Sequence, residues 1–263
     1  MQVRSDVELA NLTDIGCERT ENEDYYCYFE PETDEDFESK GRLLAIADGM
    51  GGHAGGKVAS GLAIEALRET FLNGQAANSQ AVLIEAFARA QQAILAAGEG
   101  NPELNGMGTT CTAAILCGHK LTYGHIGDSR LYLVHDGIIR QLTEDHSLVN
   151  QLVKSGALTP EQAALHEERN VLTAALGMKS QQVSADFSPE PLNIEANDVL
   201  VLTSDGMHGL VTAEEIAQSA FFESPYDACR NLVQLAKQRG GPDNITIQVL
   251  KVLPDPRAKT RIQ

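Results

Sequence analysis

The hydrophobic positions of the chain follow two different spacings. Short apolar runs separated by turn signals predict strands at residues 7–12, 25–29, 43–47, 109–117, 121–126, 130–135, 138–142, 183–187, 199–203 and 245–253. Apolar residues at helical spacing predict helices at residues 57–72, 148–154, 161–165, 214–220 and 227–239. A further helix begins near Ser79, with Leu83, Phe87, Ala90 and Ile94 on one face.

The order of these elements predicts the fold class. Strands follow one another through tight turns and helices come in separate pairs, which favours an α+β fold with antiparallel sheets over a doubly wound fold. Residues 146–182 are polar and interrupted by glycines, so we expect a small lid there. Residues 30–41 contain six acids and predict a solvated loop, and residues 254–263 predict a loose tail.

Composition limits the classes of binding partner and the cellular compartments that the chain suits. The formal net charge of −17 argues against nucleic acid or an anionic membrane as a partner, because both need a basic surface. The five cysteines are odd in number and form no C-x-x-C, so neither a disulfide framework nor a thiolate zinc site is indicated. The N-terminus lacks the apolar stretch of a signal peptide, and no apolar run is long enough to span a membrane. We therefore expect a cytoplasmic protein.

The loop at residues 45–56, AIADGMGGHAGG, carries the first candidate chemistry. Residues 51–57 have the spacing of a P-loop, but Val58 stands where that motif needs a hydroxyl for Mg²⁺. The alternative is a metal site in which Asp48 is a ligand and the glycines let the backbone approach the ion. The missing hydroxyl favours the metal site.

Acids stand at the ends of several predicted strands. A fully apolar run followed by Asp-Gly occurs twice, at Asp48 and Asp205, and Asp24, Asp128 and Asp243 lie at other strand ends. A single Asp at such a position is usually a cap or a turn residue. Several acids brought together repel one another unless a cation neutralises them, and oxygen ligands suit Mg²⁺ or Mn²⁺.

The motifs resemble a known family. TDIGCERTENED, ADGMGGHAGG, MGTT, GDSRLY, SDGM and GGPDNITI occur in the order found in metal-dependent protein Ser/Thr phosphatases of the 2C type, and DGMGGHAGG is similar to the bacterial branch. The resemblance covers residues 6–252. It implies two antiparallel sheets packed as a sandwich between helix pairs (αββα), in one phosphatase domain over residues 1–253 with a flap at residues 146–182.

The resemblance also implies a role for each site residue. Asp48 would bridge two Mn²⁺ or Mg²⁺ ions, Gly49 would offer its carbonyl, and Asp205 and Asp243 would complete the first ion's ligands. Asp24 would ligate the second ion or orient its water. The residues expected to support these ligands from behind are Asn22, Glu23 and Asn244.

Three further residues follow from the same resemblance. Arg19 would bind the phosphate of the substrate, because a planar guanidinium grips two oxygens at once. His53 is the candidate general acid for the leaving group, although it is equally suited to hold the glycine loop in shape. Asp128 would bind a weaker third ion, but Gly209 stands where relatives often place another acid, and His208 is a substitute to consider.

The implied activity is hydrolysis of phosphoserine and phosphothreonine in proteins, by attack of a water or hydroxide that bridges the two ions. In a bacterium this would reverse the work of a Ser/Thr kinase. The alternatives are a catalytically weak homologue that acts as a binding module and a hydrolase of small phosphomonoesters. The flap departs from the common pattern at Glu167 and Ala174, so substrate contacts of relatives are not transferred. Thr109 and Thr110 are interpreted as structural.

Overall fold

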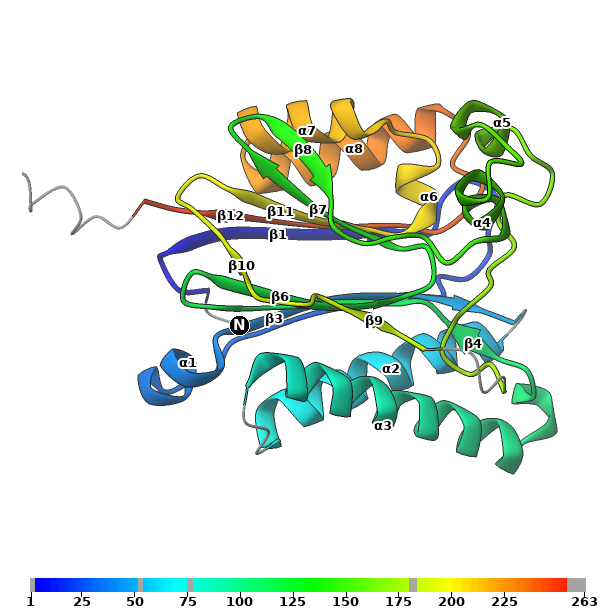
Figure 1. Cartoon of the computed structure of the whole chain (residues 1–263), viewed down its shortest axis with the longest axis horizontal. Coiled ribbons are helices and arrows are strands. Elements are labelled where there is room, and N and C mark those ends of the chain that lie inside the picture. Colours follow the sequence, from blue (N-terminus) through cyan, green and yellow to red (C-terminus); the bar gives the residue numbers. More distant parts are fainter. Residues whose placement is uncertain (1–2, 52–53, 75–77, 180–183, 255–263) are drawn as a thin grey trace, which may run out of the picture.

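Two antiparallel sheets face one another at the centre of the molecule (Figure 1). The computed structural model describes residues 3–51, 54–74, 78–179 and 184–254. The first sheet contains, in spatial order, β1 (Val7–Asp14), β12 (Ile245–Val252), β11 (Val199–Thr203), β7 (Arg130–His135) and β8 (Ile138–Gln141). The second contains β10 (Leu192–Asn193), β6 (Lys120–Ile126), β5 (Cys111–Cys117), β3 (Arg42–Met50) and β2 (Asp24–Phe29), with β9 (Asp186–Phe187) paired to β6 and β4 (Gly108–Thr109) paired to β3.

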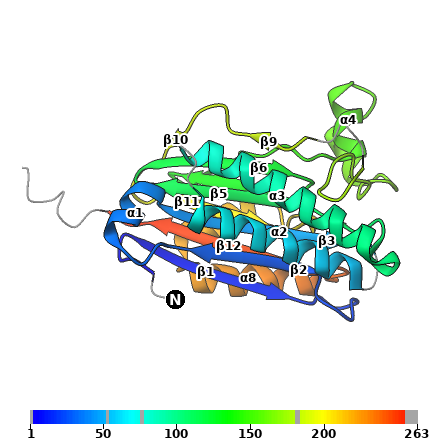
Figure 2. The same ribbon diagram turned by 90° about the horizontal axis from the view of Figure 1, so that it is seen from below.

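Helix pairs cover the outer faces of both sheets. Figures 1 and 2 show α2 (Ala54–Asn73) and α3 (Ser79–Gly100) on the second sheet, and α7 (Ala213–Phe222) and α8 (Pro225–Gln238) on the first. The shorter helices are α1 (Asp34–Lys40), η1 (Pro102–Leu104), α4 (Leu148–Lys154), α5 (Pro160–Ala164) and α6 (Asp205–His208). The predicted α+β sandwich between helix pairs is confirmed.

Three buried apolar clusters hold these four layers together. One lies between α2, α3 and the second sheet, and another lies between the first sheet, α7 and α8. The third lies between the two sheets and includes Leu44 and Ile46 of β3, whose neighbour Ala45 faces the outer cluster. β3 is therefore apolar on both faces, which explains its uninterrupted hydrophobic run. No helix among the described residues is long and apolar enough to cross a membrane.

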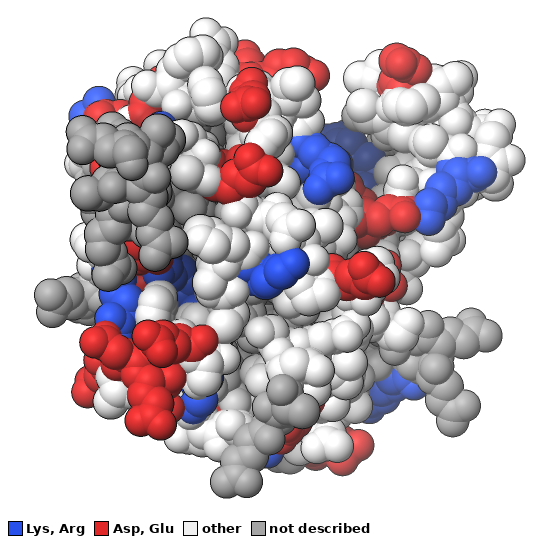
Figure 3. All heavy atoms as spheres, turned by 60° about the vertical axis from the view of Figure 1, so that its left-hand side comes forward, with Lys and Arg blue, Asp and Glu red and all other residues white. Residues whose placement is uncertain are grey.

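The acidic segment at residues 30–41 is not a loop throughout, so that prediction was wrong. Thr33 accepts a hydrogen bond from the Asp36 amide and starts α1, whose first turn is acidic, and Gly41 with φ 71° ends it. Phe37 lies beneath the guanidinium groups of Arg4 and Arg42, at 4.2 and 5.0 Å from the ring centroid. Figure 3 shows acidic side chains gathered on the side where α1 lies.

Two predicted strands also differ from the structure. The run at residues 109–117 is divided at Thr110 into β4 and β5, because the Thr110 hydroxyl and amide bond to the main chain of Asp48 instead of extending one ladder. Of the strand predicted at residues 183–187, the structure describes only β9, and residue 183 lies outside the described residues. The short elements β10 and α6 had no clear hydrophobic pattern and were not predicted.

Candidate metal centre

Several strand ends meet at one edge of the sandwich, on the right in Figure 1. β2 and β3 are antiparallel and Asp24 pairs with Asp48, so the start of β2 lies beside the last residues of β3. β11 and β12 are antiparallel as well, with Thr203 opposite Ile247, so the residues that follow β11 lie beside the start of β12. The sheet topology therefore brings together acids that are far apart in the sequence.

These ends surround a pocket of about 370 Å³. Its wall contains five carboxylates, one guanidinium and the main chain of the glycine loop. The acids are Glu23, Asp48, Asp128, Asp205 and Asp243, and Arg19, Gly49, Met50, Gly51, Thr110 and Asn244 complete that side. Asn170, Leu172 and Met178 contribute the flap side of the wall. Asp24 is the one predicted metal ligand in the described residues that is not part of this wall.

Close backbone packing fixes Asp48 and Glu23 in the wall. A Cβ on Gly49 would overlap the main-chain oxygen of Gly56, and a Cβ on Gly56 would overlap the Glu23 carboxylate. The Glu23 carbonyl accepts hydrogen bonds from the Gly49 amide at 3.2 Å and from Ser60 Oγ at 2.5 Å. Only glycine permits this approach of β3, α2 and the segment before β2, which accounts for the glycines after Asp48.

Asp24 lies one layer behind the pocket. Its Oδ2 accepts hydrogen bonds from Ser204 Oγ at 2.9 Å and from Thr246 Oγ1 at 2.6 Å. Its Oδ1 is buried and has no hydrogen-bond partner in the described residues. Burial raises the pKa of Asp24 to about 7, although the hydroxyls of Thr246 and Ser204 act in the opposite direction.

Asn22 and Asn244 support the loop that carries these acids. The Asn22 side chain accepts from the Asp24 amide and donates to Thr13 Oγ1. The Asn244 side-chain oxygen accepts from the Glu23 amide at 2.8 Å, and its Nδ2 donates to two carbonyls of the preceding loop. Both side-chain amides are thus engaged within the loop and its neighbours, Asn244 with the backbone alone and Asn22 with one amide and one hydroxyl, as supporting residues would be.

The pocket acids repel one another. Burial raises the pKa of Asp48 well above its usual value, and the charges of Asp24 and Asp205 raise it further. Burial also raises the pKa values of Asp128 and Asp205. The charge of Asp205 raises the pKa of Asp128 further, and the charge of Asp243 raises the pKa of Asp205 further. A cluster of this kind holds protons or binds cations, because separated negative charges in a low dielectric are unfavourable.

The donor set fits hard divalent cations. Asp205 Oδ1 is buried without a hydrogen-bond partner in the described residues, and all five acids offer oxygen. Within the described residues, however, no group of three or more His, Cys, Asp or Glu side chains is arranged so that it could hold a metal ion by itself. Mg²⁺ usually keeps several waters and needs only one or two carboxylates per ion, so an open acidic wall suits it better than a closed cage.

Arg19 is positioned by one of these acids. Its Nη2 lies 2.7 Å from Asp243 Oδ2, and its side chain is 53% exposed at the pocket edge. It is the only cationic side chain in the described wall of this pocket. His53 lies outside the described residues, and its role stays a prediction.

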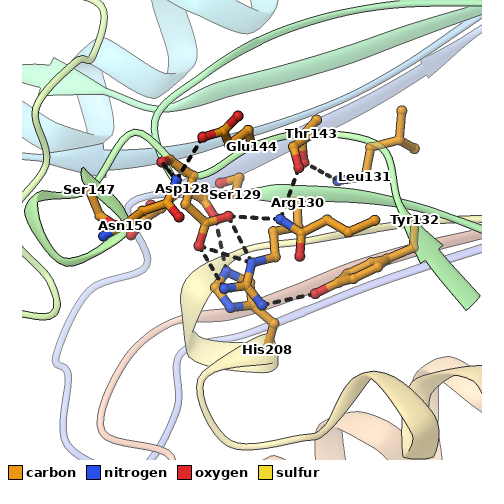
Figure 4. Close-up of polar contacts among 12 residues, drawn as sticks. Asp128, Ser129, Arg130, Leu131, Tyr132, Thr143, Glu144, Ser147, Asn150 and His208 are labelled. Carbon is orange, nitrogen blue, oxygen red and sulfur yellow. Dashed lines mark hydrogen bonds and ion pairs between the residues drawn. The ribbon is translucent and has the colours of Figure 1, made fainter. Parts of the chain in front are cut away.

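Asp128 lies in the turn between β6 and β7, and His208 holds its backbone (Figure 4). His208 Nε2 is 3.0 Å from the Asp128 carbonyl oxygen, which only accepts, so this nitrogen carries the proton. Burial lowers the pKa of His208 to about 3, so the ring is neutral at pH 7. This bond leaves the lone pair on Nδ1, the nitrogen through which a neutral imidazole would bind a metal, so His208 as a substitute ligand stays a prediction.

Sequence reasoning missed several residues around the site. Ser204 and Thr246 bind the Asp24 carboxylate, and their only signal is their place inside the SDG and DNIT segments. Thr109 and Thr110 are structural as predicted, and their bonds to the Asp48 main chain at 2.8 to 3.0 Å show what they hold. The flap residues in the wall carried no recognisable pattern.

Comparison with known proteins agrees with this geometry. The family model described as protein phosphatase 2C matches residues 32–237. Protein phosphatase PhpP of Streptococcus pneumoniae is 35% identical over 252 residues, which are 94% of this chain and 98% of that protein. The chain belongs to the protein phosphatase 2C family. The predicted family and the predicted class of enzyme are both confirmed.

Solved structures of the 2C family share the whole fold. The crystal structure of the Mycobacterium tuberculosis serine/threonine phosphatase PstP has a TM-score of 0.83 at 36% identity, and the match covers 94% of this chain and 99% of that one. The catalytic domain of PstP in complex with two manganese ions has a TM-score of 0.80 at 35% identity, with the same coverage. In sequence, PstP is 40% identical over 212 residues, which are 81% of this chain and 40% of that protein.

Proposed function

We propose that the acidic pocket holds two Mn²⁺ or Mg²⁺ ions and that the chain uses them to hydrolyse phosphoserine and phosphothreonine in proteins. The observation that carries the proposal is the pocket wall itself, in which five acids face one guanidinium and Asp205 keeps a buried oxygen that has no partner among the described residues. The serine/threonine phosphatases among its relatives, and the two manganese ions bound by PstP, support the same activity.

Two cations bound in this pocket would lower the pKa of water and offset the charge of the phosphoryl group. Asp48, Asp205 and Asp243 would hold them with the Gly49 carbonyl, because these groups share one wall. Glu23 also lies in this wall, whereas Asp24 is behind it with one oxygen engaged by two hydroxyls. We therefore assign the direct contact to Glu23, and to Asp24 the orientation of water through its free oxygen.

Arg19 would bind and orient the substrate phosphate. It stands at the mouth of a pocket that is otherwise acidic, so a phosphoryl group entering it meets one fixed positive charge before it meets the acids. The bond from Arg19 to Asp243 keeps the guanidinium at this place. Proton donation to the leaving alkoxide by His53 is part of the proposal, and so is a weaker third ion at Asp128.

The biological setting follows from the substrate class. A phosphatase of phosphoserine and phosphothreonine would oppose a Ser/Thr kinase, and we place both in the bacterial cytoplasm. The five cysteines are free thiols, three of them buried, which supports a reducing compartment. The single phosphatase domain over residues 1–253, with its flap at residues 146–182, belongs to the same proposal.

The test compares Asp48→Asn with the native chain on a phosphothreonine peptide and on p-nitrophenyl phosphate, with Mn²⁺ present. The native chain is expected to hydrolyse both and to prefer the peptide. The variant should hydrolyse neither, while in EDTA it unfolds at a temperature similar to or higher than that of the native chain. Faster turnover of the small ester than of every peptide would indicate a small-molecule hydrolase. A folded native chain that binds Mn²⁺ and turns over neither substrate would be a binding module.

A further inference from the structure

A second pocket lies directly beside the acidic one. It has a volume of about 490 Å³ and lies between the flap helices α4 and α5 on one side and β7 and α6 on the other. Asp128, Asn170 and Asp205 line both pockets, so the two spaces adjoin. We call this space the flap pocket. Figure 1 shows α4 and α5 stacked beside α6 at the end of the sandwich where the acids meet.

The two flap helices present mainly apolar side chains to this pocket. These are Val149 and Val153 of α4 and Pro160, Ala163 and Ala164 of α5. The α5 side chains here are small, so the two helices do not fill the space between them and the body. Ala164 lines the pocket and is nonetheless exposed, whereas Ala163 is buried. Ser147 and Asn150 also line this side, but Ser147 Oγ accepts from the Asn150 amide and Asn150 Nδ2 donates to Glu144 and to the Asp145 carbonyl. The wall therefore offers contact to an aliphatic guest and few free hydrogen-bonding groups.

The charges on the body side are already neutralised by one another (Figure 4). Arg130 donates from Nε and Nη2 to both oxygens of Asp145, at 2.6 to 3.1 Å, and from Nη1 to Tyr132. His208 is neutral and donates to the backbone of Asp128. An ionic guest would therefore find no uncommitted charge on this side, apart from the acids shared with the metal centre.

We propose that the flap pocket is a subsite for an apolar side chain of the phosphoprotein, close in sequence to the phosphorylated residue. This inference rests on the proposed function. The position of the flap pocket selects the guest. A peptide whose phosphoryl group lies in the acidic pocket would continue past the three shared residues and bring a neighbouring side chain to the flap pocket. An extended chain advances about 3.3 Å per residue, so a side chain a few positions away reaches the flap pocket.

One residue of the wall favours a different guest. Arg169 is exposed and its side chain makes no hydrogen bond or ion pair with the described residues. If Arg169 governed the pocket, an acidic side chain would be preferred at the same peptide position. The five apolar residues outnumber this one charge, and a solvated guanidinium contributes little, so the apolar guest is favoured.

The experiment measures kcat/KM for phosphothreonine peptides in which a single leucine replaces alanine, moved along the peptide one position at a time. At one position the leucine peptide is expected to be hydrolysed roughly tenfold better, as for one apolar side chain in an apolar pocket. Aspartate at that position should give no gain. A preference for aspartate, or no preference at any position, would overturn the proposal.

Variants then place the preference in this pocket. Ala164→Trp fills the space and should abolish the leucine preference, and Val153→Thr, which keeps the shape but adds a hydroxyl, should reduce it. Leu165→Trp is the matched control, because Leu165 is the next residue, is 85% exposed and does not line the pocket. A leucine preference that survives Ala164→Trp unchanged would show that the leucine side chain binds to another surface.

Hydrolysis of p-nitrophenyl phosphate distinguishes a failure of the proposed function from a failure of the proposed subsite. This ester has no peptide and should be turned over equally by the native chain and all three variants. If the native chain itself fails on the ester and on every peptide, the proposed function is wrong. If ester turnover is normal and Ala164→Trp leaves every peptide unaffected, the subsite alone is wrong.

Discussion

The two ends of β3 carry buried charge in opposite states. At the start of the strand, Arg42 is 1% exposed and its Nη2 lies 2.8 Å from both oxygens of Asp6, with Glu30 Oε1 3.3 Å from its Nε. At the other end, Asp48 lies among four further acids and a single guanidinium. β3 thus connects a cluster in which acids balance the charge of a guanidinium to one in which the acids outnumber the single cation.

The difference separates a structural charge from a functional one. Glu30 also accepts hydrogen bonds from the Tyr28 hydroxyl and the Arg4 amide. The charge of Arg42 is balanced by Asp6 and Glu30, although its Nε and Nη1 have no hydrogen-bond partner in the described residues. The acids around Asp48 have too few internal cations, and Asp24 and Asp205 each keep a buried oxygen without a partner in the described residues. Such a cluster is unfavourable for folding unless something outside the chain neutralises it.

Arg42→Met should have the largest effect, and it should be on stability. It leaves Glu30 buried without its cation, which typically lowers the free energy of unfolding by about 3–5 kcal/mol. Urea unfolding measures the loss. Adding Glu30→Gln to the variant should restore part of the stability. Specific activity of the folded fraction should stay near the native value, and a loss of turnover at unchanged stability would break the contrast.

Asp205→Asn should have the opposite effect, a loss of activity without a loss of stability. Removing one ligand is expected to lower kcat/KM about a hundredfold or more, since even supporting groups around metals cost 10–100-fold. In EDTA, the same variant should unfold at a higher temperature than the native chain, because one repelling buried acid is gone. Activity near the native value would rule out Asp205 as a ligand, and a lower melting temperature in EDTA would contradict the account of repulsion.

The pH dependence of stability sharpens the contrast further. The folded protein holds a proton on Asp24 up to about pH 7, whereas the unfolded chain releases it near pH 4. The stability from this proton is therefore full below about pH 4 and is lost as the pH rises through 7. In EDTA, the free energy of unfolding should be greater at pH 5 than at pH 7.5, by about 2 kcal/mol.

Saturating Mn²⁺ provides the control for this pH effect. Bound cations favour the ionised acids, so the gain at low pH should disappear or reverse. Stability in EDTA that rose steadily from pH 5 to pH 7.5 would show that the acids are not buried and protonated as described.

Arg19→Ala should have the smallest effect of the four. It removes a phosphate contact at a half-exposed position, so we expect KM to rise roughly tenfold and kcat to change less. Arg19→Lys should recover only part of the loss, because an ammonium does not grip two oxygens in one plane. Unchanged KM in Arg19→Ala would assign phosphate binding to another group.

The sequence predicted the layers because apolar patterns report burial, and β3 shows this well. Its apolar run is buried on both faces and was found, whereas its continuation through Asp48 and Gly49 to Met50 was not, since polar and glycine residues carry no strand signal. Helix α1 was missed for a related reason: an acidic first turn reads as a loop unless the Thr33 cap is recognised.

The site was predictable where motifs encode it and not where the fold assembles it. The acids and Arg19 stand in recognisable segments, and the structure brings them, except Asp24, into one wall. That Glu23 and not Asp24 faces the pocket depends on the hydroxyls of Ser204 and Thr246, which hold Asp24 and come from segments far away in the sequence. The flap pocket arises from small side chains that leave a space, and sequence patterns do not report spaces.

The central claim is that the uncompensated acids hold the cations used in catalysis. The most direct test titrates Mn²⁺ into EDTA-treated, dialysed protein while hydrolysis of a phosphothreonine peptide and bound Mn²⁺ are both followed. The account predicts no turnover without metal, and activity that rises to its full value as two ions bind per chain. Full turnover in EDTA, or full activity with a single bound ion, would contradict it.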